Sequence, residues 1–167
     1  MSVTDHRAHA PASVRCAVVT ISDTRTHATD TSGRAIVELL GERGHQVVHR
    51  TIVRDEADEI HDVLEAALGR DDVDVVLTTG GTGISSRDGT FEIVSGLLEK
   101  PIDGFGELFR MLSYTDIGPA AMLTRACAGV ARRKILVSMP GSEAAVRLAM
   151  HKLLLPELGH LVREARR

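Results

Sequence analysis

Aromatic side chains are scarce in this sequence, which has no tryptophan, one tyrosine and three phenylalanines among 167 residues. Aliphatic side chains must therefore fill the core, and this favours a layered α/β architecture. The shortage also leaves no aromatic platform on which single-stranded bases could stack. The formal net charge of −3 argues against a nucleic-acid partner, whose phosphates would call for a basic face, so we expect none.

Cysteines are also few, and long apolar runs are missing. Cys16 and Cys127 stand among small apolar residues and match no metal-binding spacing, so we expect buried, reduced thiols. No apolar stretch reaches the roughly 18 residues of a membrane span. The N-terminus lacks the apolar segment of a secretory signal. We therefore expect a cytoplasmic protein without membrane contact, with a disordered tail over residues 1–13 and one domain over residues 14–167.

Short apolar runs alternate with amphipathic segments along the chain. Residues 14–21 and 74–79 are typical of strands covered on both faces, and residues 45–54 form a β-branched strand pattern. Between them, residues 29–44 and 56–70 carry apolar side chains at helical spacing. This order predicts a single-domain α/β fold, with a mostly parallel sheet between two layers of helices. Further helices are predicted over residues 90–98, 104–118 and 142–167, and two short strands over residues 127–139.

Polar residues follow each predicted strand, at the edge of a parallel sheet where ligands bind. After residues 74–79 comes a glycine-rich segment whose backbone N–H groups, with the dipole of the next helix, suit an anion. It is not a Walker P-loop, because the lysine is missing, and the dinucleotide-binding fingerprint is absent as well. The candidate residues at this edge are Ser22, Asp23, Arg54, Asp55, Thr79, Gly80, Gly81, Thr82, Gly83, Pro140, Gly141 and Ser142.

Two aspartates near this edge are open to two interpretations. Asp55 follows the second strand and Asp88 precedes the helix predicted over residues 90–98, so either could cap a helix. Together they could instead hold Mg²⁺, which binds one or two carboxylates plus substrate phosphates. Arg87 could pair with an anion or simply be solvated. The eight histidines show no ligand spacing, so we expect no metal role for them.

Four segments carry a family resemblance when they are taken together. They are ISDTRTHATDTSG at 21–33, TTGGTGISSRD at 78–88, DGFGELFRMLSYTDIG at 103–118 and SMPGS at 138–142. These segments resemble the MoaB/Mog family of molybdenum-cofactor biosynthesis proteins, and within it the MoaB branch. The likeness runs from about Val14 to Leu158. The resemblance implies a molybdopterin-binding α/β fold that is usually a trimer or a dimer of trimers.

The resemblance also implies an activity. Active relatives are similar to molybdopterin adenylyltransferases, which couple molybdopterin and Mg-ATP to give adenylylated molybdopterin and pyrophosphate. Asp55 and Asp88 match the two important aspartates of the family, so the resemblance implies that they are catalytic and hold Mg²⁺. The implied substrate-binding residues are Ser22, Asp23, Thr79, Gly80, Gly81, Thr82, Gly83, Arg87, Pro140, Gly141 and Ser142.

Two other functions and two departures from the family pattern must be considered beside this interpretation. A molybdopterin carrier or scaffold would bind without turnover, and an unrelated phosphate-handling hydrolase could use the same kind of sheet. The hydrolase is disfavoured because no G-x-S-x-G motif is present. Gly89 and Phe91 stand where the family more often has valine and proline. Since proline fixes φ at a helix start, we expect a less rigid start for the helix over residues 90–98.

Overall fold

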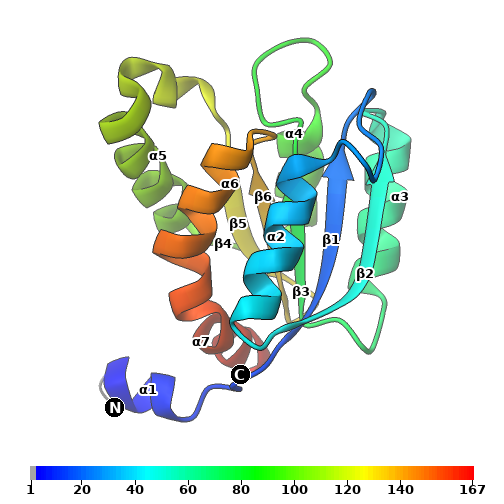
Figure 1. The fold of residues 1–167 in the computed structure, drawn as a ribbon. Helices are drawn as coiled ribbons and strands as arrows, with labels where there is room; N and C mark the ends of the chain where they lie inside the picture. The colour runs from blue at the N-terminus through cyan, green and yellow to red at the C-terminus, as the bar shows by residue number, and fades with distance from the viewer. Residues whose placement is uncertain (1–2) are drawn as a thin grey trace.

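The chain folds around a six-stranded sheet with the strand order β2-β1-β3-β6-β5-β4 (Figure 1). A computed structural model describes residues 3–167. β1, β2, β3 and β6 run parallel, β5 is antiparallel to β6, and β4 is antiparallel to β5, so the predicted mostly parallel sheet is confirmed. The strands are β1 (Arg15–Ile21), β2 (Gln46–Val53), β3 (Val75–Thr79), β4 (Lys100–Pro101), β5 (Cys127–Ala131) and β6 (Lys134–Met139).

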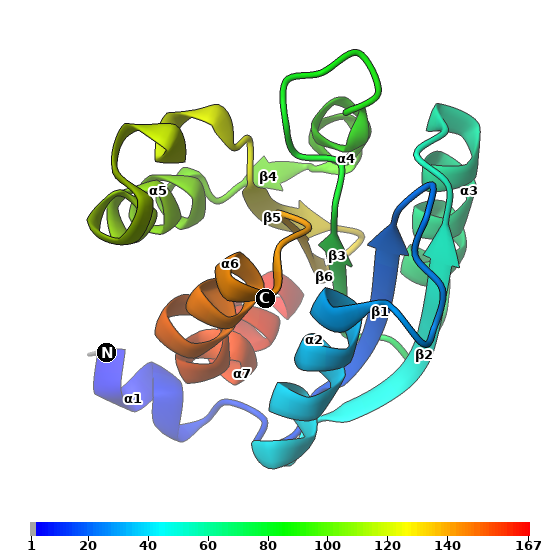
Figure 2. The same ribbon diagram turned by 45° about the horizontal axis from the view of Figure 1, so that its top comes forward.

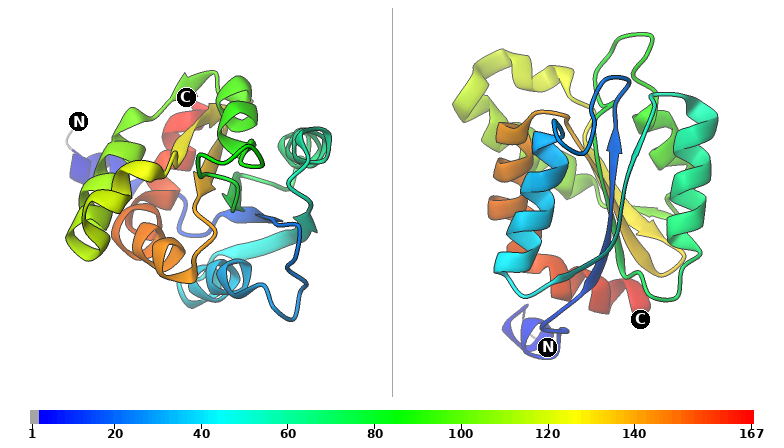
Figure 3. Two further views of the ribbon diagram at one scale, coloured as in Figure 1. Left: turned by 90° about the horizontal axis from the view of Figure 1, so that it is seen from above. Right: turned by 45° about the vertical axis from the view of Figure 1, so that its right-hand side comes forward.

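Helices cover both faces of this sheet, which confirms the predicted layers (Figure 3). Neighbouring residues of a strand point to opposite faces, so β1 sends Cys16 and Val18 into one core and Ala17 and Val19 into the other. The first core is closed by α2 (Thr31–Glu42), α5 (Asp103–Ile117), α6 (Glu143–Ala149) and α7 (Leu155–Arg166), and the second by α3 (Ala57–Leu68) and α4 (Thr90–Leu97). Within residues 3–167, no helix combines the length and the apolar content needed to cross a bilayer.

The C-terminal helical segment is divided, although the sequence predicts mostly helix over residues 142–167. A π-helix over Met150–Leu154 separates α6 from α7, and the chain turns sharply there (Figure 3). Pro156 lies in the first turn of α7. Because proline has no amide hydrogen and its ring crowds the preceding turn, the regular bonding pattern is interrupted just before it.

Three short elements have no counterpart among the predicted ones. β4 contains Pro101, which the sheet tolerates because this strand lies at its edge. A 3₁₀-helix, Gly118–Leu123, follows α5. In the tail expected to be disordered, α1 (Val3–Ala8) contacts α7, and Arg7 pairs with Glu157. Residues 1–2 of that tail lie outside the described residues.

Both cysteines are free thiols, as expected, although only Cys16 is fully buried and Cys127 is half-buried. Burial raises the pKa of the Cys16 thiol to about 12 and that of the Cys127 thiol to about 11. Both thiols therefore stay protonated at neutral pH, and neither is an activated nucleophile.

Asp30 is a fully buried carboxylate that joins the start of α2 to the sheet. Its Oδ1 accepts a hydrogen bond from the Gly33 amide at 2.9 Å, and its Oδ2 accepts from Thr20 Oγ1 at 2.7 Å and from Arg50 Nη2 at 3.1 Å. Burial alone would raise the pKa of Asp30, but these hydrogen bonds and the charge of Arg50 lower it overall. The carboxylate is therefore ionised and fully engaged in the folded protein.

We expect Asp30→Asn to lower the free energy of unfolding by about 2–4 kcal/mol at neutral pH, because the amide cannot balance the charge of Arg50. The folded-state pKa of Asp30 lies below the unfolded value of about 3.9. The stabilisation by Asp30 is therefore fully present above its unfolded-state pKa, and it is lost as the pH falls through its folded-state pKa.

Urea unfolding of wild type and variant, at neutral pH and near pH 3, tests this prediction. The difference in the free energy of unfolding between wild type and Asp30→Asn should be smaller at the lower pH. Asp58→Asn, at an exposed position of α3, serves as the control and should change stability little. An equal loss at both pH values would contradict the assignment.

Candidate functional site

A pocket of about 340 Å³ opens at the edge of the sheet where β1 and β3 end. The two strands are neighbours, but the chain continues from β1 into α2 on one face and from β3 into α4 on the other. The diverging connections leave a crevice, which is where open α/β sheets bind ligands. Figure 2 shows the loops after β1, β3 and β6 gathered at this edge. This rim pocket is lined by Thr20, Ile21, Ser22, Arg25, Ser32, Thr79, Gly80, Gly81, Thr82, Gly83, Asp88 and Gly141.

The floor of the rim pocket is main chain, supplied by the glycine loop (residues 80–89) that joins β3 to α4. Gly80 and Gly81 have φ angles of +106° and +69°, which side chains rarely adopt. A Cβ on Gly80 would lie 2.2 Å from the carbonyl oxygen of Ile21, and one on Gly81 would lie 2.0 Å from Thr90 Oγ1. Only glycine therefore lets the loop pass this close to β1 and α4.

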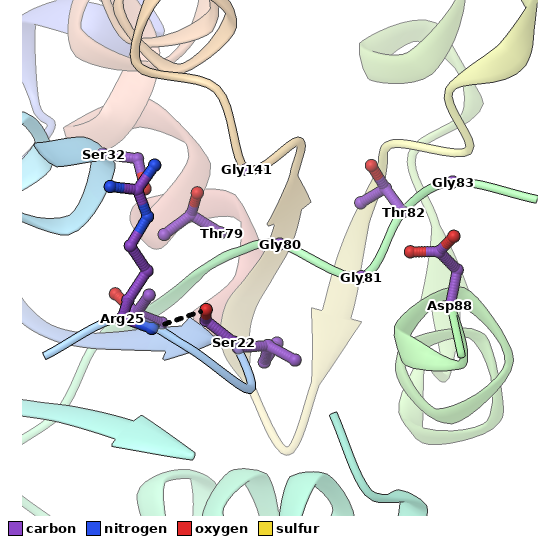
Figure 4. A pocket seen from close by; sticks show the side chains of 12 residues that line it. Ser22, Arg25, Ser32, Thr79, Gly80, Gly81, Thr82, Gly83, Asp88 and Gly141 are labelled. Atoms are coloured by element: carbon purple, nitrogen blue, oxygen red, sulfur yellow. Dashed lines mark hydrogen bonds between the residues drawn. The ribbon is translucent and has the colours of Figure 1, made fainter. Parts of the chain in front are cut away.

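Arg25 brings a positive charge into the rim pocket, although it is not among the residues predicted from the sequence. Its amide donates to Ser22 Oγ at 3.0 Å, and its Nη1 donates to the Thr29 carbonyl at 2.7 Å. Figure 4 shows Arg25 and Asp88 on opposite sides of the Gly80–Gly81 segment. A guanidinium here can pair with an anionic ligand. The available signal was its place directly after a buried strand, within the 21–33 segment.

Asp88 does not cap α4, so the capping interpretation of this residue is wrong. Gly89 is the N-cap of α4, whereas Asp88 Oδ2 accepts from the Ser85 amide at 2.9 Å and from Ser85 Oγ at 2.6 Å. The bond from the Ser85 side chain is the largest influence and lowers the pKa of Asp88. Asp88 thus presents an ionised carboxylate to the rim pocket.

Asp55 does not cap a helix either, because Glu56 is the N-cap of α3. The Asp55 carboxylate lies behind the glycine loop, where a Cβ on Gly81 would come within 3.4 Å of its Oδ2. Its Oδ1 is buried and has no hydrogen-bond partner. Burial raises the pKa of Asp55, and the charges of Asp88 and Asp23 raise it further. The ionised form of the Asp55 carboxylate is therefore destabilised next to the glycine loop.

Arg87 is bound to protein carboxylates, outside the lining of the rim pocket. Its Nη2 donates to both Asp23 oxygens at 3.0 and 2.9 Å, and its Nη1 donates to Glu56 Oε1 at 3.0 Å. Asp23 Oδ1 also accepts from the Asp55 amide at 3.0 Å. The hydrogen bond from Arg87 is the main cause that lowers the pKa of Asp23. Arg87 and Asp23 thus tie the connections after β1 and β2 to the glycine loop.

The turn after β6 contributes only part of what the sequence suggests. Gly141 lines the rim pocket. The carbonyl of Pro140 accepts from Thr79 Oγ1 at 2.8 Å, and Ser142 caps α6 by accepting from the Ala145 amide at 3.2 Å. Pro140 and Ser142 therefore hold the turn in place beside the loop.

Known proteins are similar to this chain in both sequence and fold. A family model described as "Probable molybdopterin binding domain" matches residues 17–160. Molybdenum cofactor biosynthesis protein B of Bacillus cereus is 58% identical over 168 residues, which cover 100% of this chain and 99% of the relative. The protein of the same name from Bacillus subtilis is 50% identical over 168 residues, with the same coverage of 100% and 99%.

Solved structures agree with these sequence matches. A crystal structure of molybdenum cofactor biosynthesis protein B has a TM-score of 0.92 at 58% identity, and the match covers 95% of this chain and 99% of that one. The tungsten cofactor synthesizing protein MoaB from Pyrococcus furiosus has a TM-score of 0.84 at 37% identity, over 95% of this chain and 100% of that one. This chain therefore belongs to the molybdopterin-binding-domain family, and within it to the MoaB branch.

Proposed function

We propose that this protein is a cytoplasmic molybdenum-cofactor biosynthesis enzyme that binds molybdopterin in the rim pocket and adenylylates it with Mg-ATP, releasing pyrophosphate. The observation that carries the proposal is the buried, unpartnered Asp55 Oδ1 beside a main-chain cradle. An anion cradle and an unbalanced carboxylate suit a reaction that brings a phosphate and a cation together. The family membership supports molybdopterin as the ligand.

A magnesium ion fits the carboxylates at this site. Burial and the charges of Asp88 and Asp23 raise the pKa of Asp55, and a bound cation would remove this cost. Across residues 3–167, no three histidine, cysteine or acidic side chains are grouped to hold a metal. Asp55 and Asp88 would therefore hold Mg²⁺ together with phosphate oxygens and water, as this ion prefers. The bound ion would neutralise charge on the transferring phosphate.

The chain itself would bind and align the two reactants. A terminal phosphate oxygen of molybdopterin attacks the α-phosphorus of ATP, a new P–O bond forms, and the bond to the leaving pyrophosphate breaks. Backbone N–H groups of the glycine loop and the guanidinium of Arg25 lie where they can hold the anionic groups. Alignment and charge stabilisation supply most of the catalysis in such a transfer.

Pyrophosphate release from molybdopterin and Mg-ATP by the wild-type protein tests the proposal directly. We expect release to depend on both substrates and on the metal. A second candidate is a non-catalytic molybdopterin carrier or scaffold, which would use the same rim pocket without turnover. Tight pterin binding, measured by fluorescence, with no pyrophosphate release would select that carrier and reject the enzyme.

Self-association is part of the proposal, because α5 and the 3₁₀-helix expose an apolar face that a lone chain would leave in water. The exposed residues are Leu108, Met111, Tyr114, Ile117, Met122 and Leu123. Large exposed apolar patches mark interaction surfaces, and soluble assemblies are mostly symmetric copies of one chain. Together with the family resemblance, this face supports a trimer or a dimer of trimers.

We expect light scattering at micromolar concentration to give the mass of a trimer or hexamer. Met111→Glu should shift the mass towards the monomer, because a buried interface charge lacks a partner. Gln46→Glu adds the same charge at an exposed position of β2 and should leave the mass unchanged. A monomeric mass for the wild type would refute the assembly.

A further inference from the structure

Arg125, in the segment between the 3₁₀-helix and β5, is bound to the glycine loop at several points. Its amide donates to the Thr82 carbonyl at 2.9 Å, its Nε donates to the Gly83 carbonyl at 2.9 Å, and its Nη2 donates to the Asp88 carbonyl at 2.8 Å. Its Nη1 pairs with Glu92 in the first turn of α4. One side chain therefore joins both ends of the loop to the helix that follows it.

Two of these contacts, one from the main-chain amide of Arg125 and one from its guanidinium, fix peptide groups that also face the aspartates. Arg125 holds the carbonyls of the Thr82–Gly83 and Asp88–Gly89 peptides, and the chain has no cis peptide among its described residues. In a trans peptide the C=O and N–H groups point in opposite directions. The N–H of the first peptide faces the Asp88 carboxylate, and the N–H of the second faces that of Asp55. Both carboxylates are thus oriented through peptides that Arg125 anchors.

We infer that Arg125 is a positioning residue, which holds Asp55 and Asp88 in register by anchoring the two peptide groups that face them. The inference deepens the proposed adenylyl transfer and rests on it for its catalytic meaning. Arg125 lies in a different part of the chain from the loop, so no motif of the loop includes it. A lysine could keep the charge but could not donate to Gly83, Asp88 and Glu92 at once, because it lacks the planar fork.

Phe91 has a place in the same arrangement. The Cζ of Arg125 lies 5.2 Å from the centre of the Phe91 ring, so the guanidinium packs over the ring. This contact orients the plane from which Nε and Nη2 reach the loop. The start of α4 is therefore restrained by the arginine above the ring.

The test compares Arg125→Lys with wild type in pyrophosphate release. We expect kcat to fall about 10- to 100-fold, because small displacements of catalytic groups have such effects. KM for molybdopterin should change less than about threefold, which marks a loss of alignment rather than of binding. Arg70→Lys is the matched control, since Arg70 makes a bidentate pair with Asp72 at the opposite edge of the sheet, and its kcat should match wild type.

A second measurement does not depend on turnover. Hydrogen exchange at the Gly89 amide, followed by NMR, should become about tenfold faster in Arg125→Lys, because the guanidinium holds the carbonyl of that peptide. The β1 amides should keep their protection. Unchanged exchange at Gly89 in the folded variant would overturn the inference, and so would an unchanged kcat. If the wild type has no turnover, adenylyl transfer fails, and the exchange rate of the Gly89 amide alone decides the role of Arg125.

Discussion

Asp55→Asn should lower Mg-dependent adenylyl transfer by about 10²- to 10³-fold, equivalent to about 3–4 kcal/mol of transition-state stabilisation. The substitution keeps the size of the side chain but removes the charge that makes the buried, unpartnered Oδ1 a ligand for a cation. Asp88→Asn should have a similar effect, because Asp88 lines the rim pocket and would share the cation with Asp55. Molybdopterin binding should weaken much less in both variants, since the cradle is main chain.

Pyrophosphate release, measured beside pterin fluorescence, separates these outcomes. Asp62→Asn is a suitable control, because Asp62 lies on the exposed side of α3 and its side chain is 85% exposed. A fall in kcat with binding retained identifies groups that act in the transition state. Turnover that survives both substitutions would show that Asp55 and Asp88 do not hold the metal.

Gly81→Val should reduce molybdopterin affinity by about 10²-fold or more, the second large effect that we expect. The φ of +69° at Gly81 lies in a region that β-branched residues avoid, and the added Cβ would lie 2.0 Å from Thr90 Oγ1. The loop must therefore move, and its N–H groups lose their alignment on the ligand. The rest of the sheet should keep its fold, since the loop lies at its edge.

Fluorescence titration with molybdopterin measures the affinity, and circular dichroism checks the fold. Gly96→Val adds the same side chain within α4, where the new Cβ would meet no atom within 4 Å beyond the adjacent backbone of the helix, and it should bind like wild type. If Gly81→Val unfolds the protein, the smaller Gly81→Ala replaces it. An unchanged affinity in a folded Gly81 variant would remove the glycine loop from the binding site.

Local patterns predicted the parts of the fold that depend on local burial. β1 and β3 are covered on both faces, so their apolar runs were sufficient, and α3 buries one stripe that its sequence displays. The docking of α1 and the pairing of β4 depend on distant partners, α7 and β5, and leave no periodic signal. Pro156 was the one sequence feature that indicated the π-helix before it. Proline is also common in the first turn of a regular helix, so its presence alone did not predict the interruption.

The parts of the rim pocket that are formed by the backbone could be predicted from the sequence. The ion pairs between charged side chains around it could not. The strand-end rule located Gly80–Gly83 and Gly141, which line the rim pocket together. The partners of Arg87 were not readable, because Asp23 and Glu56 reach it only through the folded connections after β1 and β2. Arg125 was missed for the same reason, since its acceptors are carbonyl groups, which every residue has.

The main-chain floor of the rim pocket also limits how substitutions during evolution can alter ligand specificity. Peptide groups are identical at every position, so most substitutions near the loop leave the binding surface chemically unaltered, whereas Gly80 and Gly81 tolerate almost none. Adaptation to a different ligand is therefore confined to the few side chains around the floor, such as Ser22, Arg25 and Ser32. Ligand specificity should therefore change slowly, and a new specificity would require substitutions among these lining side chains.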